Sequence, residues 1–398
     1  MPIRQKMYAL FVLSVINFTH IVDSMIIMPL GDTFIHEFDI TTFQYSFLVS
    51  SYAIAAAIAS LVGIFFIDRY DRKKVLLFCY LGFGIGTLIC AYSPGYYLLT
   101  TARFFTGLFG GLIGAIGLSI VSDLFTFQER GKAMGFLYAA FSAASAFGVP
   151  IGIYLAAKSN WQLPFLVIGG LAILISILIY FTFPNLTAHL SKIPKKVSFS
   201  SLTNILEDKN QVNALLAGFV LVMAHFMIIP FISPFMIKNI GFSPEQISLQ
   251  FMLGGIATMI TSPYIGRMTD KIGFMKVFVA VMTLSFIPTI IITNLQPVPV
   301  GIALIFTTLF FVFGSGRMIS PNTIITASAP TVTRGSFMAL KSSLQQLAIA
   351  FTGIISGNII AIGADGKYEN YAYVGALSVI LGIVTFYFIA KLKVAEGN

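Results

Sequence analysis

Hydrophobic residues along this chain are grouped into long runs, which short polar segments separate. An α-helix rises 1.5 Å per residue, so roughly 20 apolar residues cross the ~30 Å core of a bilayer. Runs of about this length number twelve: 7–31, 44–67, 75–93, 96–122, 133–157, 163–183, 211–236, 247–265, 275–293, 299–325, 336–362 and 370–390. Membrane β-strands of about ten alternating residues do not fit such runs. The pattern predicts an all-α integral membrane protein with twelve transmembrane helices.

Composition supports this prediction. Of 398 residues, 57% are apolar and only 10% are charged, whereas soluble domains carry about 25% charged residues. The apolar content excludes a disordered chain, and the presence of only two cysteines excludes a disulfide scaffold. The first run follows Arg4 and Lys6, but it is too long for a signal peptide, contains Asp23 and lacks a small-residue cleavage site. We expect it to be retained as the first helix.

The basic residues predict the orientation in the membrane. Of 24 Lys and Arg residues, 19 fall at the two termini and in the loops after even-numbered spans, including Lys276 and Lys341 just inside helix ends. Cytoplasmic loops are rich in Lys and Arg, so both termini are expected to be cytoplasmic. The net charge of +9 is therefore a sign of topology and not of nucleic-acid binding.

An internal repeat divides the chain into two halves. The pair His20 and Pro29 recurs as His225 and Pro234 at an offset of 205 residues, and Asp68-Arg69 recurs as Asp270-Lys271 at an offset of 202. Parallel repeats of six helices are one build of secondary transporters. We therefore expect two pseudo-symmetric six-helix bundles, over 1–186 and 211–398, joined by a cytoplasmic linker over 187–210.

Short motifs in both halves resemble those of the major facilitator superfamily, and the resemblance covers the whole chain. The family's G-x-x-x-D-R/K-x-G-R/K loop motif is similar to the segment from Gly63 through Asp68 and Arg69, where Asp71 replaces the second glycine, and to Gly266 through Gly273. The run from Arg103 to Gly107 is similar to R-x-x-Q-G, with Thr in place of Gln. The run Gly148-Val-Pro150-Ile-Gly152 partly matches the Gly-Pro motif of the family's antiporters, and the first helix resembles those of bacterial drug and sugar efflux members.

This resemblance implies roles for the loop charges and for the Gly-Pro motif. The charges after the second span would close the cytoplasmic gate, with Arg72 reaching Asp123 and with Asp270 and Lys271 as the weaker counterpart in the second half. The alternative is that the basic residues only anchor the helix ends at the cytoplasmic side of the membrane. The gating set is Asp68, Arg69, Arg72, Asp123, Asp270 and Lys271. Gly148, Pro150 and Gly152 are expected to bend the fifth helix.

Charges inside the spans are the sharpest candidates for function, because each costs about 2.5–3.5 kcal/mol or more in lipid unless it faces a partner or a cavity. Asp23 is the only acidic residue deep within a span, and helix rise places Arg103 at a similar depth. If transport makes and breaks an Asp23–Arg103 pair, then Asp23 is a proton carrier. The other reading is a static ion pair.

Further polar side chains in the spans complete the candidate site. Asn17, His20 and Asp23 form one stripe on the first helix, and His20 could relay protons because imidazole titrates near neutral pH. His225 occupies the matching place in the seventh span. Arg317 must hold an anion, carbonyl groups or water in a cavity, since arginine stays charged. Gln345, one turn beyond Lys341, either contacts substrate or extends to the interface with it.

These residues predict a proton-coupled efflux transporter of the bacterial cytoplasmic (inner) membrane, working as a monomer on small amphipathic or hydrophobic molecules or sugars. No phosphate-binding loop, metal-ligand spacing or soluble catalytic domain is present, so no cofactor, metal or enzymatic activity is expected. One alternative is an organic-anion uptake symporter or uniporter in which Arg317 binds the anionic group. An alternative of another class is a non-transporting membrane receptor or assembly protein.

Overall fold

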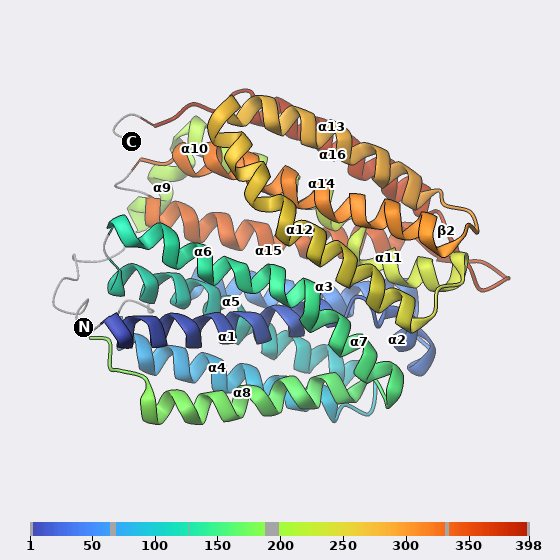
Figure 1. The fold of residues 1–398 in the computed structure, drawn as a ribbon, viewed down its shortest axis with the longest axis horizontal. Helices are drawn as coiled ribbons and strands as arrows, with labels where there is room; N and C mark the ends of the chain where they lie inside the picture. Colours follow the sequence, from blue (N-terminus) through green and yellow to red (C-terminus); the bar gives the residue numbers. More distant parts are fainter. Residues whose placement is uncertain (1–2, 64–68, 126, 188–198, 331–333, 396–398) are drawn as a thin grey trace.

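The computed structural model describes residues 3–63, 69–125, 127–187, 199–330 and 334–395. It is an all-α protein of two six-helix bundles, which we call the first half and the second half (Figure 1). The first half comprises α1 (Ile3–Ile26), α2 (Gly31–Glu37), α3 (Thr42–Gly63), α4 (Arg72–Ala91), α5 (Tyr96–Leu124), α6 (Phe127–Ala143), the π-helix η2 (Ala144–Gly148), α7 (Val149–Lys158) and α8 (Gln162–Thr182).

The second half follows a short helix, α9 (Phe199–Glu207), which lies in the predicted linker. Its elements are α10 (Lys209–Phe226), α11 (Ile229–Phe235), the π-helix η4 (Met236–Ile240), α12 (Pro244–Ile272), α13 (Phe274–Thr293), α14 (Val300–Ala327), α15 (Arg334–Ile359), the hairpin β1 (Ala361–Ile362) and β2 (Tyr368–Glu369), and α16 (Tyr371–Ile389). The hairpin is antiparallel, with Ala361 opposite Glu369.

The predicted spans correspond to helices of this fold. Ten described helices or helix runs are long and apolar enough to cross a membrane. The other two predicted spans, 247–265 and 336–362, lie on α12 and α15, which have 29 and 26 residues and carry more polar side chains. At 1.5 Å per residue, each of these is also longer than the ~30 Å bilayer core.

Local sequence signals explain where several helices begin. Asp71 caps α4 by accepting a hydrogen bond from the Lys73 amide, and Asp208 caps α10 in the same way. Ser243 and Gln246 form a reciprocal capping box at the start of α12, with Pro244 in the first helical position. Such caps satisfy backbone N–H groups that a helix start leaves without partners.

Two of the predicted spans are interrupted, and a third contains a π-helix. The first breaks between α1 and α2 at Pro29, and the seventh breaks between α10 and α11 just before Pro230. Proline lacks the N–H that would continue the helix, and its ring displaces the preceding turn. In the fifth span, the π-helix η2 joins α6 to α7, which starts at Val149 with Pro150 in its first turn. The fifth span therefore stays helical through the predicted Gly-Pro motif, with a π-helical turn directly before Val149.

The most extensive contacts between the halves are those of α3 with α15 and of α12 with η2 and α7. α3 packs along α15. There the Ser50 hydroxyl donates to the Ala350 carbonyl and the Ser343 hydroxyl donates to the Ala57 carbonyl, both with an oxygen–oxygen distance of 2.9 Å. α12 packs against η2 and α7, and a Cβ on Gly255 would lie 2.5 Å from the Ala146 backbone nitrogen. Backbones this close require a residue without a side chain.

The two ends of the bundle differ. Both ends of the described chain lie at one end, beside α9, which we call the termini end (Figure 1). The opposite end, which we call the hairpin end, carries β1–β2, α2 and α11 (Figure 1). At the hairpin end the halves are bonded directly, since the Thr42 hydroxyl donates to the carbonyls of Gly357 and Ile360.

Candidate functional site

A buried network in the first half brings together three of the predicted site residues. Asp23 on α1 and Arg103 on α5 form an ion pair, with Arg103 Nη1 2.8 Å from Asp23 Oδ2. The Asp23 side chain is 0% exposed and that of Arg103 only 1%. The second carboxylate oxygen, Oδ1, accepts a hydrogen bond from the Thr87 hydroxyl on α4 at 3.1 Å. The pair that helix depth predicts is present.

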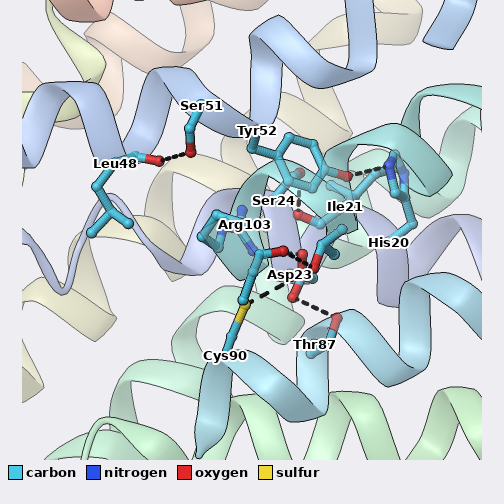
Figure 2. A network of polar contacts seen from close by, with 12 residues as sticks. His20, Ile21, Asp23, Ser24, Leu48, Ser51, Tyr52, Thr87, Cys90 and Arg103 are labelled. Carbon is cyan, nitrogen blue, oxygen red and sulfur yellow. Dashed lines mark hydrogen bonds and ion pairs between the residues drawn. The ribbon is translucent and has the colours of Figure 1, made fainter. Parts of the chain in front are cut away.

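Tyr52 on α3 connects this pair to His20. Its ring lies 4.5 Å from the Arg103 guanidinium carbon, a cation–π contact. Its hydroxyl lies 2.8 Å from His20 Nε2 (Figure 2). Sequence reasoning missed both Tyr52 and Thr87, because each is the kind of single polar residue that transmembrane helices commonly carry. Their proximity to charges is visible only in the fold.

Glycines of α5 allow this arrangement. A Cβ on Gly107 would lie 2.3 Å from the Tyr52 carbonyl oxygen, and one on Gly110 would lie 2.1 Å from the Tyr52 hydroxyl. α3 can therefore approach α5 closely enough for Tyr52 to reach between Arg103 and His20. Small residues commonly form such helix interfaces in membranes.

Two nitrogen atoms of the network have no hydrogen-bond partner in the described part of the chain. They are His20 Nδ1 and Arg103 Nε, and both are buried. Asn17, the third member of the predicted stripe, donates instead to the Leu137 carbonyl on α6 at 3.1 Å. The stripe is thus divided, with His20 and Asp23 in the network and Asn17 at the contact between α1 and α6.

Arg317 forms a second buried centre with His225 in the second half. Its Nη2 donates to the Ala224 carbonyl at 3.1 Å and lies 3.0 Å from His225 Nδ1, while Nη1 donates to Ser285 at 3.4 Å. Ala224 is in the last turn of α10, so the cation lies at a helix C-terminus, which favours positive charge. Of the partners considered for Arg317, the structure shows helix-terminal carbonyls. Asp23, the acidic residue deep within a span, forms its ion pair with Arg103 and not with Arg317.

No described carboxylate lies within 4.0 Å of the Arg317 side chain, and its buried Nε has no partner among the described residues. His225 stacks on Phe310 of α14, with ring centroids 5.9 Å apart. Gln345 is half-buried on α15, with no hydrogen bond from its side chain to another described residue. A polar group that protein atoms leave without partners is available to a ligand.

The predicted gating residues that the structure describes form two groups at the termini end. Arg72 Nε lies 3.1 Å from Asp123 Oδ2, which joins the start of α4 to the end of α5. Arg69, Asp270 and Lys271 are exposed. Asp68 lies outside the described residues. Asp71, which departs from the family motif, caps α4 and also accepts from the Leu186 amide, a role that sequence reasoning did not assign.

Gly148 and Gly152 lie against α1. A Cβ on Gly148 would lie 2.2 Å from Val22 Cγ2, and one on Gly152 would lie 2.6 Å from Ile26 Cδ1. The Pro150 carbonyl accepts a hydrogen bond from Ser248 of the second half at 3.0 Å. The motif therefore combines a change from π-helix to α-helix with close packing on α1 and a contact between the halves.

Comparison with known proteins gives matches over the whole chain. A family model described as Major Facilitator Superfamily matches residues 13–210 and 214–397. The uncharacterised MFS-type transporter YbcL of Bacillus subtilis (strain 168) is 21% identical over 377 residues, covering 95% of this chain and 94% of its own. A probable sugar efflux transporter of Helicobacter acinonychis (strain Sheeba) is 25% identical over 235 residues, covering 59% of each chain.

Solved structures share the fold. A D-xylose-proton symporter superposes with a TM-score of 0.79 at 16% identity, covering 98% of this chain and 99% of its own. A bacterial homologue of the human lysosomal transporter Spinster, in an inward-facing and unoccupied conformation, gives a TM-score of 0.74 at 14% identity, covering 98% and 97%. At these identities the likeness concerns the fold, and function has to be argued from the site.

Proposed function

This chain belongs to the Major Facilitator Superfamily, and we propose that it exports small amphipathic or hydrophobic molecules or sugars in exchange for protons. The two halves would rock about a site near the middle of the membrane, so that it opens alternately to each side. The observation that carries the proposal is the Asp23–Arg103 ion pair, which is fully buried in the spans α1 and α5.

Proton coupling follows from the energetics of that pair. Breaking a buried ion pair by removing one partner typically costs 3–5 kcal/mol, because a charge stays behind without compensation. If rocking separates Asp23 from Arg103, protonation of the carboxylate removes that cost. Proton binding and the conformational change are then one coupled event. His20, which is linked to Arg103 through Tyr52, would be the relay between Asp23 and water.

The remaining roles follow the same scheme. Arg72 and Asp123 would hold the termini end closed when the halves approach each other there, together with Asp68, Arg69, Asp270 and Lys271. Asn17, His225, Arg317 and Gln345 would line the substrate cavity. The Lys- and Arg-rich loops support a cytoplasmic position for both termini, and the bacterial relatives support the inner membrane as location. The transporter would work as a monomer.

A second candidate is uptake of an organic anion, as symporter or uniporter. It is favoured by Arg317, which is 1% exposed and has no carboxylate within 4.0 Å among the described residues. In this case the anionic group of the substrate would complete the environment of the guanidinium. The probable sugar efflux transporter among the relatives favours the first candidate.

Proteoliposomes with an internal pH dye and an imposed pH gradient test the proposal. Cationic, neutral and anionic compounds are added to the wild type, to Asp23→Asn and to Asp365→Asn, a control that changes an exposed carboxylate in the hairpin. We expect some compounds to trigger proton movement with the wild type and with Asp365→Asn. With Asp23→Asn the signal should fall to that of empty liposomes, because the amide cannot carry the proton.

Other results would point elsewhere. Compound-triggered proton movement that is unchanged in Asp23→Asn would exclude Asp23 as the carrier and direct attention to His20 and His225. A flux driven only by anions and lost in Arg317→Ala, with proton binding intact, would favour the organic-anion carrier.

A further inference from the structure

The buried charged side chains of the two halves differ in how they are neutralised. Six are buried among the described residues: Asp23, Asp71, Arg72, Arg103, Arg317 and Lys341. In the first half, Asp23 pairs with Arg103, Arg72 pairs with Asp123, and Asp71 caps a helix. The two in the second half are both cations. Neither has a carboxylate within 4.0 Å among the described residues, and the sequence has no acidic residue between Asp270 and Asp365.

Arg317 has three polar contacts that compensate its charge, whereas Lys341 has one among the described residues. The guanidinium lies on the carbonyl end of α10 and contacts Ala224, His225 and Ser285. Lys341 is the eighth residue of α15, which begins at Arg334. It lies two turns inside the helix, far from the C-terminal carbonyl groups that favour a cation. A buried ammonium in such a place costs several kcal/mol unless a partner is provided.

The Lys341 ammonium group has unused donors. It bonds to Asn322 Oδ1 on α14 over 2.7 Å, its one hydrogen bond to a described residue. An ammonium group has three N–H donors, so two have no partner among the described residues. The Asn322 amide nitrogen donates to the Met318 carbonyl at 2.7 Å, which orients the amide oxygen towards Lys341. The lysine is 7% exposed and therefore does not extend to the membrane surface.

Gln345 follows Lys341 by one helical turn, so both lie on one face of α15. Its side chain and that of Asn322 are half-buried and therefore reachable from outside the packed core. Leu340 and Leu344 on the same helix belong to an apolar cluster. A cation with two donors that no described residue uses, next to the Gln345 amide and apolar side chains, fits the carboxylate or sulfonate of an amphipathic molecule.

We propose that Lys341, with Asn322 and Gln345, binds the anionic group of the transported molecule. The inference rests on the proposed transport function and specifies its substrate class as amphipathic monoanions. α15 is part of the interface between the halves, where it bonds to α3 through Ser343 and Ala350. A ligand on Lys341 is therefore placed beside helices that a rocking motion would displace.

Equilibrium binding to purified protein in nanodiscs, without any pH gradient, tests the site. The probes are 1-naphthoate, 1-naphthylmethanol and 1-naphthylmethylamine, which share one ring system and are anionic, neutral and cationic. We expect wild type to bind naphthoate at least about tenfold more tightly than naphthylmethanol, a difference of ~1.4 kcal/mol. Lys341→Gln should abolish this preference and Lys341→Arg should keep it. Lys276→Gln, which removes an exposed lysine from α13, is the matched control and should keep it too.

A second variant keeps the test decisive if Lys341→Gln does not fold. Asn322→Asp places a carboxylate where the 2.7 Å partner of Lys341 now lies, so it should raise the melting temperature and remove the preference for naphthoate. An anion preference unchanged in Asn322→Asp or Lys341→Gln, or its absence in wild type, would overturn the proposal. Because no proton gradient is involved, failure here is separate from failure of Asp23→Asn in the flux assay.

Discussion

Replacing Arg103 by glutamine is expected to lower the free energy of unfolding by about 3–5 kcal/mol, the usual cost of leaving one member of a buried ion pair alone. Asp23 would keep only the Thr87 hydroxyl at 3.1 Å as a hydrogen-bond donor. The cation–π contact with Tyr52 would be lost as well. Arg103→Lys should give a smaller loss, because the charge remains but the planar guanidinium that stacks on Tyr52 does not.

The double variant Asp23→Asn/Arg103→Gln separates pairing from packing. Removing both charges should recover much of the stability lost in Arg103→Gln, since no lone charge stays buried. Unfolding in a detergent titration is the measurement. The exposed pair Asp365–Lys367 serves as control, and its single variants should change stability by about 0–1 kcal/mol. A double variant as unstable as Arg103→Gln would mean that the pair is not the source of the effect.

The sequence predicts the spans well because each transmembrane helix forms all its backbone hydrogen bonds within its own segment. The hydropathy of that segment alone is therefore enough to identify it. The ion pair between Asp23 and Arg103 was also predictable, since helix rise alone places both at a similar depth. The interruption of the first and seventh spans was not predicted, although Pro29 and Pro230 are visible in the sequence. A proline can also lie within a continuous helix, as Pro288 does in α13.

The partners of Arg317 show where sequence reasoning ends. Carbonyl groups carry no side-chain identity, so the Ala224 carbonyl is recognisable as a partner only once the end of α10 is known. The same holds for Tyr52, whose contacts depend on the close approach of α3 to Gly107 and Gly110. In the sequence, Lys341 is one of the many basic residues on the side of the membrane where both termini are expected. Only its burial and its hydrogen bond to Asn322 distinguish it from a residue that anchors a helix end.

At the hairpin end, one hydroxyl contacts both interrupted helices. Tyr45 Oη on α3 lies 3.1 Å from the Met28 carbonyl, at the break of the first span, and 2.9 Å from the Pro230 carbonyl, in α11 of the second half. The side chain is 0% exposed. A hydroxyl has a single proton, so these two carbonyls compete for it. Under the proposed alternating access, opening of this end would move the Pro230 carbonyl away from Tyr45. The Met28 carbonyl would remain as acceptor, because Met28 is in the same half as Tyr45.

Gly31 permits this contact. A Cβ on Gly31 would lie 2.6 Å from Tyr45 Cζ and 2.9 Å from Pro234 Cγ of the second half. Gly31→Val should therefore prevent closure of the hairpin end and hold the protein open there. Tyr45→Phe removes one hydrogen bond from the closed form and, because Met28 remains as acceptor after opening, one from the open form as well. Such a bond contributes about 1 kcal/mol, and the two losses nearly cancel, so this variant should shift the equilibrium by much less than the roughly fivefold that one bond would give.

Cross-linking measures this closure directly. Asp32 and Lys238 come from different halves, and their charged groups lie 3.5 Å apart at the hairpin end. Cysteines at both positions should be joined readily by a short bifunctional reagent, while the native Cys79 and Cys90 are buried. Gly31→Val should abolish the cross-link, whereas Tyr45→Phe should change its rate of formation little. Gly95→Val is the control, since a Cβ there meets no atom within 4 Å. Efficient cross-linking in Gly31→Val would show that the Tyr45 contact does not govern closure.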